Sequence, residues 1–514
     1  MDLPDFCGPP SEATLHAYLS RAITLARGFV SESLDDDLRL IRDLGVAFLG
    51  RSALIWSCDP DDEQHFAQAA AFARRVHDEV DRRVVCQAAV FEAVYPEVER
   101  IAVPDWVFAA FDEPAERRTF RFADMWRADD CLGRWPEFGS GGVVPDLRQA
   151  EARRWFYYRC RRYLDAGFEA IHLGQPHLYA ARDAGFALLD DLIARVRAYA
   201  ATAARRRWVW LDAHTHGIVR GGRLLFDLHS RPISAVNFTE RPERLILQLR
   251  GRSRGGVTPA GWRCASLPYL IEVDNWGGWS LPAGRRDDAA RASCRRWGYD
   301  DIAWFAHQPA EVRRHFLRYA HRFLRVQDDA AHFQMPVRRL LGEAPVTAAD
   351  GTQIWHYHAN RPSPACPQGF GDEETIAAIW READPAAGVE RPPAVLGHPT
   401  LPDGLDAPQE VFLVGPLQRL LGGEPGDAMS RYSRLSPRGD GTFVLTCVIP
   451  WAGEHRFAVG IDGTMTEYYR QDGLPGGADW RLVTSADNQI VRLVFDYRTR
   501  RVTAAGDGAA VRPG

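Results

Sequence analysis

The first 380 residues alternate short apolar runs with longer stretches of helical periodicity, and this limits the fold more than any other feature. Strand-length apolar runs lie at 53–57, 84–92, 168–174, 207–213, 245–249, 269–274, 302–306 and 332–335. Helical patterns lie at 62–82, 146–166, 183–204 and 309–326. Such alternation is typical of βα units, and about eight units predict an α/β fold, a (β/α)8 TIM-type barrel with insertions. A doubly wound open sheet is the alternative, although no Gly-x-Gly-x-x-Gly follows the first run.

The pattern changes after a proline-rich stretch. Residues 384–408 contain six prolines and little periodicity, which predicts a linker. Short apolar strands separated by Gly, Pro and Asp then follow at 411–414, 442–449, 455–461, 481–484 and 491–495, which predicts a small antiparallel β-sandwich. The predicted division is a barrel over 1–383, a linker over 384–408, a β-sandwich over 409–505 and a flexible tail over 506–514.

Several motifs of this last module occur in a familiar order. They are Val411–Gly415, Pro450–Phe457 (PWAGEHRF), Ile461–Tyr469 (IDGTMTEYY), Gly473–Ala478 (GLPGGA) and Val491–Thr499 (VRLVFDYRT). The module resembles the immunoglobulin-like modules of pullulanases and amylase-associated proteins. The resemblance implies a carbohydrate-active protein, in which such a module either braces a catalytic barrel or binds sugar. The N-terminal part accordingly looks like a barrel of the glycoside-hydrolase type, in no family that we can assign.

Composition removes several kinds of chemistry. The chain has no lysine, so all 63 basic residues are arginine. Schiff-base enzymes, an enolase-type lysine base, a phosphate-binding loop ending in Gly-Lys-Ser/Thr and a carbamylated lysine between two metals are therefore excluded. The net charge of −5 does not indicate a nucleic-acid-binding protein.

The sequence also predicts a location. Nine cysteines without a Cys-x-x-Cys spacing indicate reduced thiols, which are typical of the cytoplasm. No signal peptide is visible, and no apolar run approaches the roughly 20 residues of a membrane span. We therefore expect a cytoplasmic protein without a membrane partner, or a secreted one if a leader has been removed.

Polar residues follow the predicted strands, at the rim where parallel barrels bind their ligands. Glu272 and Asp274 stand two residues apart, so both point to one side of a strand. A carboxylate pair of this kind suits general acid and base or nucleophile roles. Asp212, at the end of another strand, is the first candidate partner, and Glu92 is the second.

Other residues of this rim are candidates for contacts with sugar hydroxyls and rings. They are Gln175, His214, His216, Trp276, His307 and Arg338. Together with the four carboxylates they predict a glycoside hydrolase that acts on an oligo- or polysaccharide, for example an α-glucan, and that needs no cofactor.

Two alternatives remain. His214 and His216 have the His-x-His spacing of metal ligands, so a mononuclear metal-dependent hydrolase using these residues and Asp274 is the runner-up. A non-catalytic glycan-binding or scaffold protein is the third hypothesis.

Overall fold

A computed structural model of the 514-residue chain forms the basis of the description that follows. It describes residues 3–56, 61–129, 134–135, 141–238, 241–249, 252–275, 301–342, 344–389, 410–427, 430–461, 468–469, 478–506 and 508–512. The predicted sugar-stacking residue Trp276 lies outside these residues. Within them, no helix has both the length and the apolar character needed to cross a membrane.

The chain forms two compact units, which are described separately. The first comprises 1–232, 251–275 and 332–377, and the second comprises 233–250, 276–331 and 378–514. The predicted domain boundaries at 383 and 409 stay predictions, because residues 390–409 lie outside the described ones.

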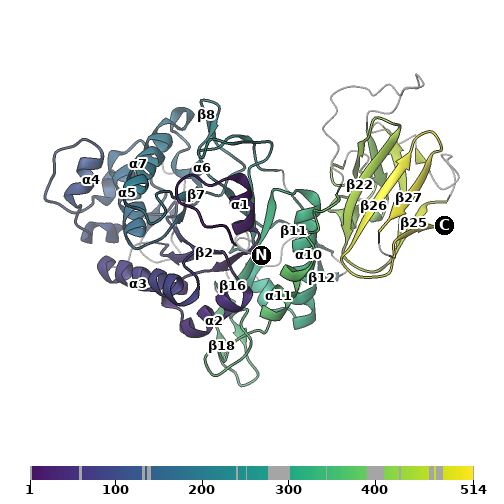
Figure 1. Cartoon of the computed structure of the whole chain (residues 1–514), viewed down its shortest axis with the longest axis horizontal. Coiled ribbons are helices and arrows are strands. Elements are labelled where there is room, and N and C mark those ends of the chain that lie inside the picture. Colours follow the sequence, from purple (N-terminus) through teal and green to yellow (C-terminus); the bar gives the residue numbers. More distant parts are fainter. Residues whose placement is uncertain are drawn as a thin grey trace. The chain divides into compact units, whose positions relative to one another are not determined.

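The first unit is built on a parallel sheet that closes into a barrel (Figure 1). Its order is β10-β15-β16-β1-β2-β3-β6-β7, and a parallel bridge between His214 and Ser230 joins the two ends of this path. The strands are β1 Ala22–Leu25, β2 Phe48–Leu54, β3 Val85–Ala89, β6 Ala170–His172, β7 Trp210–Asp212, β10 His229–Pro232, β15 Tyr269–Glu272 and β16 Ala331–Leu340. Neighbours around the barrel follow one another along the chain, which confirms the predicted (β/α)8 TIM-type barrel.

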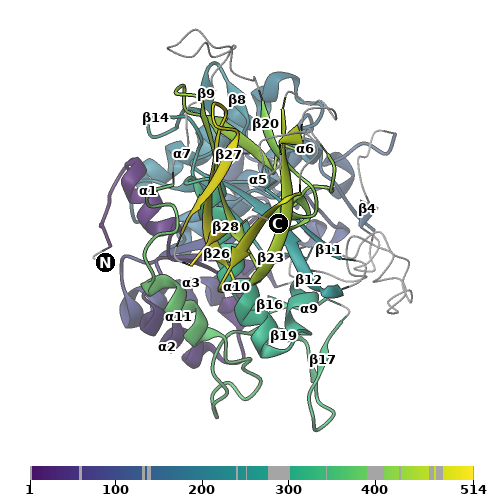
Figure 2. The same cartoon turned by 90° about the vertical axis from the view of Figure 1, so that its right-hand side faces the viewer.

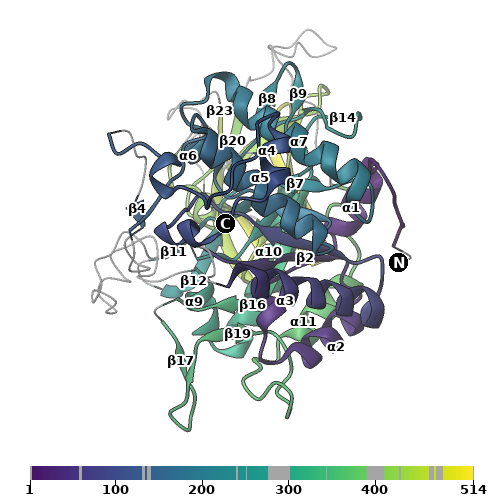
Figure 3. The same cartoon turned by 90° about the vertical axis from the view of Figure 1, so that its left-hand side faces the viewer.

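Helices cover the outside of the barrel (Figures 1 and 3). They include α1 Glu12–Leu19, α2 Leu34–Leu44, α3 Asp62–Arg75, α4 Asp105–Ala110, α5 Ala150–Asp165, α6 Pro176–Tyr179 and α7 Ala187–Ala203. Local signals set their ends: the Asp61 side chain caps the start of α3 by accepting from the Gln64 N–H, and Gly45, in the left-handed region, ends α2. Short hairpins lie among the loops of this unit: β4 Arg134–Trp135 with β5 Gly142–Val143, β8 Val219–Arg220 with β9 Arg223–Leu224, β13 Gly256–Val257 with β14 Arg263–Cys264, and β17 Val346–Thr347 with β18 Gln353–Ile354.

The barrel interior changes character along the strands. Ala170, Trp210 and Leu270 belong to one buried apolar cluster near the N-terminal end of the barrel. Because side chains alternate along a strand, the residues two positions further on also face inward. In these strands they are the terminal residues His172, Asp212 and Glu272. An apolar layer therefore lies beneath a polar layer at the C-terminal rim.

Two of the predicted strands need correction. Residues 302–306 belong to helix α9 Asp301–Ala306, because a short apolar run without alternation does not distinguish a strand from a buried helix. Residues 245–249 overlap β12 Arg241–Leu247, which pairs with β11 Ala235–Phe238 in an antiparallel hairpin outside the barrel sheet. Their places in the barrel are taken by β1 and β10. The sequence reading missed β10 because its residues, His229–Pro232, are mostly polar, and it took the later run 53–57 as the first strand in place of β1.

The second unit contains the predicted antiparallel β domain (Figure 2). Its strands are β20 Val411–Val414, β21 Arg434–Pro437, β22 Thr442–Ile449, β23 Gly453–Ile461, β24 Tyr468–Tyr469, β25 Trp480–Thr484, β26 Gln489–Asp496, β27 Arg501–Ala505 and β28 Ala510–Arg512. Alternate residues of β26 face an apolar core that includes Phe443, Phe457 and Phe495. Strand β28 pairs with β25 at residues for which the sequence predicted a tail. Helix α10 Ala310–Gln327 packs on β22 of this unit, and α12 Leu417–Leu421 follows β20.

Candidate active site at the barrel rim

Arg51 is the central cation of the rim, and its backbone is unusual. Its φ is 53°, a left-handed conformation that costs a residue with a side chain about 1–2 kcal/mol. The pairing of β2 with β3 shifts register between Leu49 and Ala53, and the Arg51 N–H donates to Oε1 of Gln87 at 3.0 Å. Such strain is typical of functional sites, where contacts of the side chain hold the backbone in place.

The guanidinium of Arg51 joins three predicted site residues. It donates to Glu272 and to Asp274, the latter at 3.2 and 3.3 Å, and its Nη2 lies 2.6 Å from Nε2 of His214. Because arginine only donates, His214 Nε2 accepts this hydrogen bond. Arg339, on β16, also donates to Asp274. The structure thus brings Glu272, Asp274 and His214 together, as the sequence predicted, around a cation that it did not predict.

Electrostatics fix the charge of this group. Burial acts to raise the pKa of Asp274, but Arg51, Arg339 and His214 outweigh it and hold this pKa well below its ordinary value. Burial likewise acts to lower the pKa of Arg51, but Asp274, Glu272 and Asp212 raise it above the ordinary value. Asp274 is therefore an anion at neutral pH, where it cannot serve as a proton donor.

Asp212 belongs to the same polar layer and holds a histidine. Its Oδ1 accepts from Nε2 of Gln87 at 2.5 Å, and its Oδ2 accepts from Nδ1 of His172 at 2.8 Å and from Oγ of Ser230 at 2.7 Å. Burial acts to raise the pKa of Asp212, but His172, Ser230 and Arg51 lower it overall. With both oxygens engaged and the side chain 1% exposed, Asp212 is suited to orienting His172.

Glu92, which follows β3, has different surroundings. Its Oε2 accepts from the backbone N–H of Gln175 at 2.9 Å, and its Oε1 accepts from Nε2 of the same residue at 2.8 Å. Gly174 makes room for it: φ there is 51°, and a Cβ would overlap Oε2 of Glu92. Among the described residues no guanidinium or imidazole lies on this buried carboxyl, so neutral amides alone hold it.

The remaining predicted site residues lie elsewhere. Arg338 is buried and donates to the carbonyl of Ala26 at 2.6 Å and to Glu32 at 2.8 Å. His216 is exposed, and its carbonyl accepts from the N–H of Arg254 at 2.6 Å. His307 follows helix α9 in the second unit, so the argument that placed it at a strand end was wrong.

Three atoms of the rim could also hold a metal ion. A nitrogen of His214 and oxygens of Glu272 and Asp274 lie within 4.8 Å of one another. His216, the second histidine of the predicted metal site, does not belong to this group. Arg51 already contacts all three side chains and supplies the positive charge that a metal would bring.

The sequence reading missed Arg51, His172 and Ser230. A signal existed for Arg51, because it is a charged residue inside the apolar run 46–55. A signal also existed for His172, which stands two residues after Ala170 just as Asp212 stands two after Trp210. Their partners are distant in sequence, Arg51 and Glu272 being 221 positions apart, so the contacts themselves left no local pattern.

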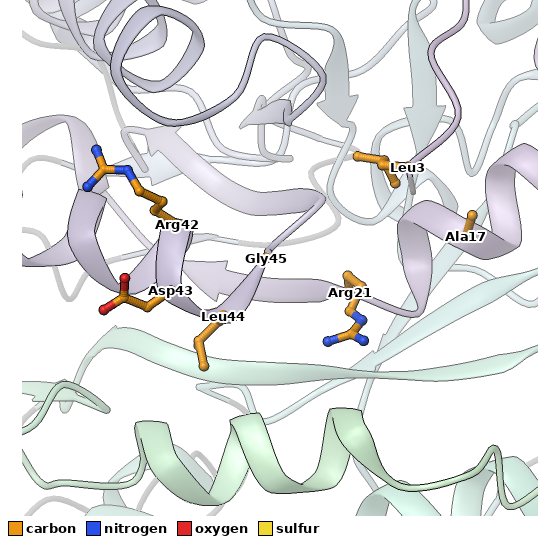
Figure 4. Close-up of a pocket in the computed structure, with 7 residues that line it drawn as sticks. All are labelled: Leu3, Ala17, Arg21, Arg42, Asp43, Leu44 and Gly45. Carbon is orange, nitrogen blue, oxygen red and sulfur yellow. The ribbon is translucent and has the colours of Figure 1, made fainter. Parts of the chain in front are cut away.

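A cavity lies at the other end of the barrel (Figure 4). It has a volume of about 260 Å³ and is lined by Leu3, Ala17, Arg21, Arg42, Asp43, Leu44 and Gly45. These residues precede β1 and β2, whereas the buried carboxylates described above follow the strands. The cavity and the buried carboxylates therefore lie at opposite ends of the barrel.

No family model and no curated protein matches this chain. Solved structures resemble it at low identity. Isomalto-dextranase of Arthrobacter globiformis T6, complexed with panose, has a TM-score of 0.35 and 11% identity over 99% of this chain and 75% of its own. A debranching enzyme of Nostoc punctiforme has a TM-score of 0.36 and 10% identity over 92% and 88%. Amy13B of Eubacterium rectale has a TM-score of 0.39 and 11% identity over 97% and 92%.

Proposed function

We propose that the chain is a carbohydrate-active enzyme, a glycoside hydrolase that cleaves an oligo- or polysaccharide, for example an α-glucan, at the C-terminal rim of its barrel. The observation that carries the proposal is the contrast between two buried carboxyls of this rim. Two guanidinium groups hold Asp274 as an anion, whereas within the described part of the chain Glu92 accepts only from the backbone and side-chain amides of Gln175. Two carboxyls in unlike environments are the usual basis of glycosidase acid–base assignments.

The barrel places these two carboxyls across from each other. Glu92 follows β3 and Asp274 follows β15, and three strands separate β3 from β15 in either direction around the closed sheet. Glycosidases need their carboxyls on opposite sides of the bond that is cleaved. Glu92 then protonates the leaving oxygen. The carboxylate of Asp274 attacks the sugar as a nucleophile, activates a water molecule as a base, or stabilises the positive charge that develops on the sugar ring.

Glu272 has a supporting role in this scheme. Its Oε1 accepts from Arg51 and lies 3.1 Å from Nε2 of His214, so it fixes the cation that in turn holds Asp274. The sequence paired Asp212 with Asp274 as a catalytic couple. Because Asp212 accepts from Nδ1 of His172 and so orients that ring, the positioning role is favoured instead.

The experiment compares Asp274→Asn and Glu92→Gln with the wild type on a panel of oligosaccharides and on aryl glycosides with activated leaving groups. We expect each variant to lose about 10²–10⁴-fold in kcat/KM on oligosaccharides. Glu92→Gln should recover much of this loss on the aryl glycosides, because an activated leaving group needs no proton, and Asp274→Asn should not. Glu63→Gln is the control, since the side chain of Glu63 on α3 is 82% exposed.

Two outcomes would overturn the proposal. Full turnover by both rim variants would show that Asp274 and Glu92 are not the catalytic carboxyls. No turnover of any glycan by the wild type would remove the activity, and binding without turnover on a glycan array would make the protein a glycan-binding one.

The grouping of His214, Glu272 and Asp274 favours a metal-dependent hydrolase as the second candidate. This function requires Arg51 to leave its three partners. Elemental analysis after expression with added metal ions decides between the two: stoichiometric metal that Asp274→Asn abolishes would favour the metal enzyme, and metal-free active protein would favour the glycosidase.

A further inference from the structure

His172 combines two features that the assignment of the carboxyls leaves unexplained. It ends β6 and faces the barrel interior, with 1% of its side chain exposed. Its Nδ1 is bonded to Asp212, but its Nε2 is buried and has no hydrogen-bond partner among the described residues. Buried polar atoms in proteins are nearly always paired, so an open one inside a candidate site calls for a ligand.

The hydrogen bonds settle which nitrogen carries the proton. Asp212 is held in its anionic form and can only accept, so Nδ1 of His172 donates the hydrogen bond between them. Ser230 and Gln87 fix the carboxylate from two other strands. Burial lowers the pKa of His172, an effect that Asp212 opposes only in part and that Arg51 and His214 reinforce, so the ring is neutral. Nε2 therefore presents a bare lone pair.

Among the described residues, no group donates a hydrogen bond to Nε2 of His172. His214 packs against it edge to face, with ring centroids 4.7 Å apart, and Phe91 lies 6.0 Å away. The guanidinium of Arg51, which contacts His214, donates its hydrogen bonds to Glu272, Asp274 and His214. Oε2 of Glu272 is a second buried acceptor without a hydrogen bond in the described structure. A ligand that enters here must donate hydrogen bonds.

We propose that His172, oriented by Asp212, contacts the substrate directly, and that its Nε2 accepts a hydrogen bond from a hydroxyl of the bound sugar. The inference rests on the proposed glycosidase function and deepens it by naming the chemistry of the group bound. Hydroxyl groups donate and fit this position. Carboxylate and phosphate groups only accept, so sugars that carry such a group at this point are excluded.

The test uses the full-length protein and three variants at two positions. His172→Phe keeps a ring but has no acceptor, and His172→Gln places an amide oxygen near the position of Nε2. In Asp212→Asn the remaining amide oxygen can still accept from Gln87, which turns the amide N–H toward Nδ1 of His172. This favours the tautomer with the proton on Nε2, which donates where the wild type accepts. His65→Gln is the matched control. His65 is equally buried, but it lies on helix α3 and contacts the hydroxyl of Tyr163 on α5.

Three kinetic results are expected on the best oligosaccharide of the panel. His172→Phe and Asp212→Asn should each lower kcat/KM about 10- to 100-fold. His172→Gln should retain more activity than His172→Phe, and the double variant His172→Phe/Asp212→Asn should be no worse than His172→Phe alone, because both changes remove one contact. Wild-type kcat/KM in His172→Phe would overturn the inference and leave the glycosidase function standing.

Nitrogen-15 spectra of histidine-labelled protein supply a readout that needs no turnover, with the His172 signals assigned by their loss in His172→Gln. We expect a proton on Nδ1 only, a shift of the proton to Nε2 in Asp212→Asn, and a change at Nε2 when the oligosaccharide binds. A proton on Nε2 in the wild type would overturn the inference. An Nε2 signal that saturating oligosaccharide leaves unchanged would also overturn it, because an ordered water and not the sugar would then occupy the position. A wild type that cleaves no glycan would overturn the proposed function instead, and the tautomer would still be measured.

Discussion

The two ends of the barrel use the same strands for different purposes. At the N-terminal end the inward residues are apolar, and at the C-terminal rim the inward residues two positions further along are polar. The pairs are Val85 and Gln87, Ala170 and His172, Trp210 and Asp212, and Leu270 and Glu272. A strand of three or four residues is thus long enough to contribute one residue to the core and one to the site.

Buried charge is also treated differently at the two ends. Near the N-terminal end, Arg206 is 2% exposed and donates to the carbonyls of Phe6 and Arg83 and to Asp5, so its charge is paired with a segment that closes the barrel. At the rim, His172 and Glu272 each keep an acceptor atom without a hydrogen bond in the described structure. Buried atoms without a hydrogen bond occur in the described residues of the N-terminal end too, at Nε of Arg206 and Oε1 of Glu169, but these two atoms form an ion pair with each other at 3.4 Å. The difference between the ends is therefore that the open atoms of the rim are acceptors inside the candidate site.

The largest expected effect comes from removing the central cation of the rim. Arg51→Met leaves Glu272 and Asp274 buried beside each other, and breaking a buried ion pair costs about 3–5 kcal/mol. We expect a loss of this size in the free energy of unfolding, measured in urea, and loss of glycan cleavage. Arg82→Met is the control, because the side chain of Arg82 is 79% exposed. Equal stability of the two variants would contradict the role given to Arg51.

Trp210→Ala, at the N-terminal end of the barrel, should lower stability without lowering activity. Trp210 is 1% exposed and packs among Phe6, Tyr18 and Phe48. Truncating a buried tryptophan costs about 3–5 kcal/mol, but kcat/KM per folded molecule should stay close to that of the wild type. Denaturation and kinetics on the same sample check both parts, and a specific loss of activity would show that the two ends are not separable.

A smaller effect concerns pH. Burial and the nearby Arg159, Arg27 and Arg162 lower the pKa of His65 to about 2. Between this value and the unfolded pKa of about 6.5, the unfolded chain binds a proton that the folded chain does not, so stability falls as the pH falls, by about 1.4 kcal/mol per pH unit. His65→Gln should remove this slope between pH 6 and 4 in denaturation experiments, without changing the pH dependence of activity. A parallel change in the activity profile would mean that protonation outside the rim also controls catalysis.

The smallest effect tests the segment that closes the N-terminal end. Phe6 stacks on Trp210 with centroids 5.0 Å apart and planes at 5°. Phe6→Ala should lower the free energy of unfolding by about 1 kcal/mol, the contribution of such an aromatic pair, and leave kcat/KM unchanged. A thermal shift assay with parallel kinetics measures both, and a loss of activity without a loss of stability would contradict the division between the ends.

The sequence predicted the barrel because alternation of strand and helix is a local property. It also placed Glu272, Asp274, Asp212 and Glu92 at or just after strand ends. This was possible because the end of an apolar run can be recognised from the sequence. It missed β10, whose sequence His-Ser-Arg-Pro is polar, and it mistook α9 for a strand.

The roles of the residues were harder to predict than their positions. Asp212 looked like a free carboxylate until Gln87, His172 and Ser230 were seen to occupy both of its oxygens. These partners come from three other strands, and only the closed sheet brings them together. Hydrogen bonding between distant strands therefore decides which carboxylate reacts and which supports.

The most direct test measures Asp274→Asn and Trp210→Ala side by side, with kcat/KM on the best glycan normalised to the folded fraction from unfolding curves of the same samples. The account predicts that Asp274→Asn is at least about 100-fold less active per folded molecule, while Trp210→Ala, which is also destabilised, keeps its activity per folded molecule. Folded Asp274→Asn with the kcat/KM of the wild type would contradict the claim that catalysis takes place at the rim.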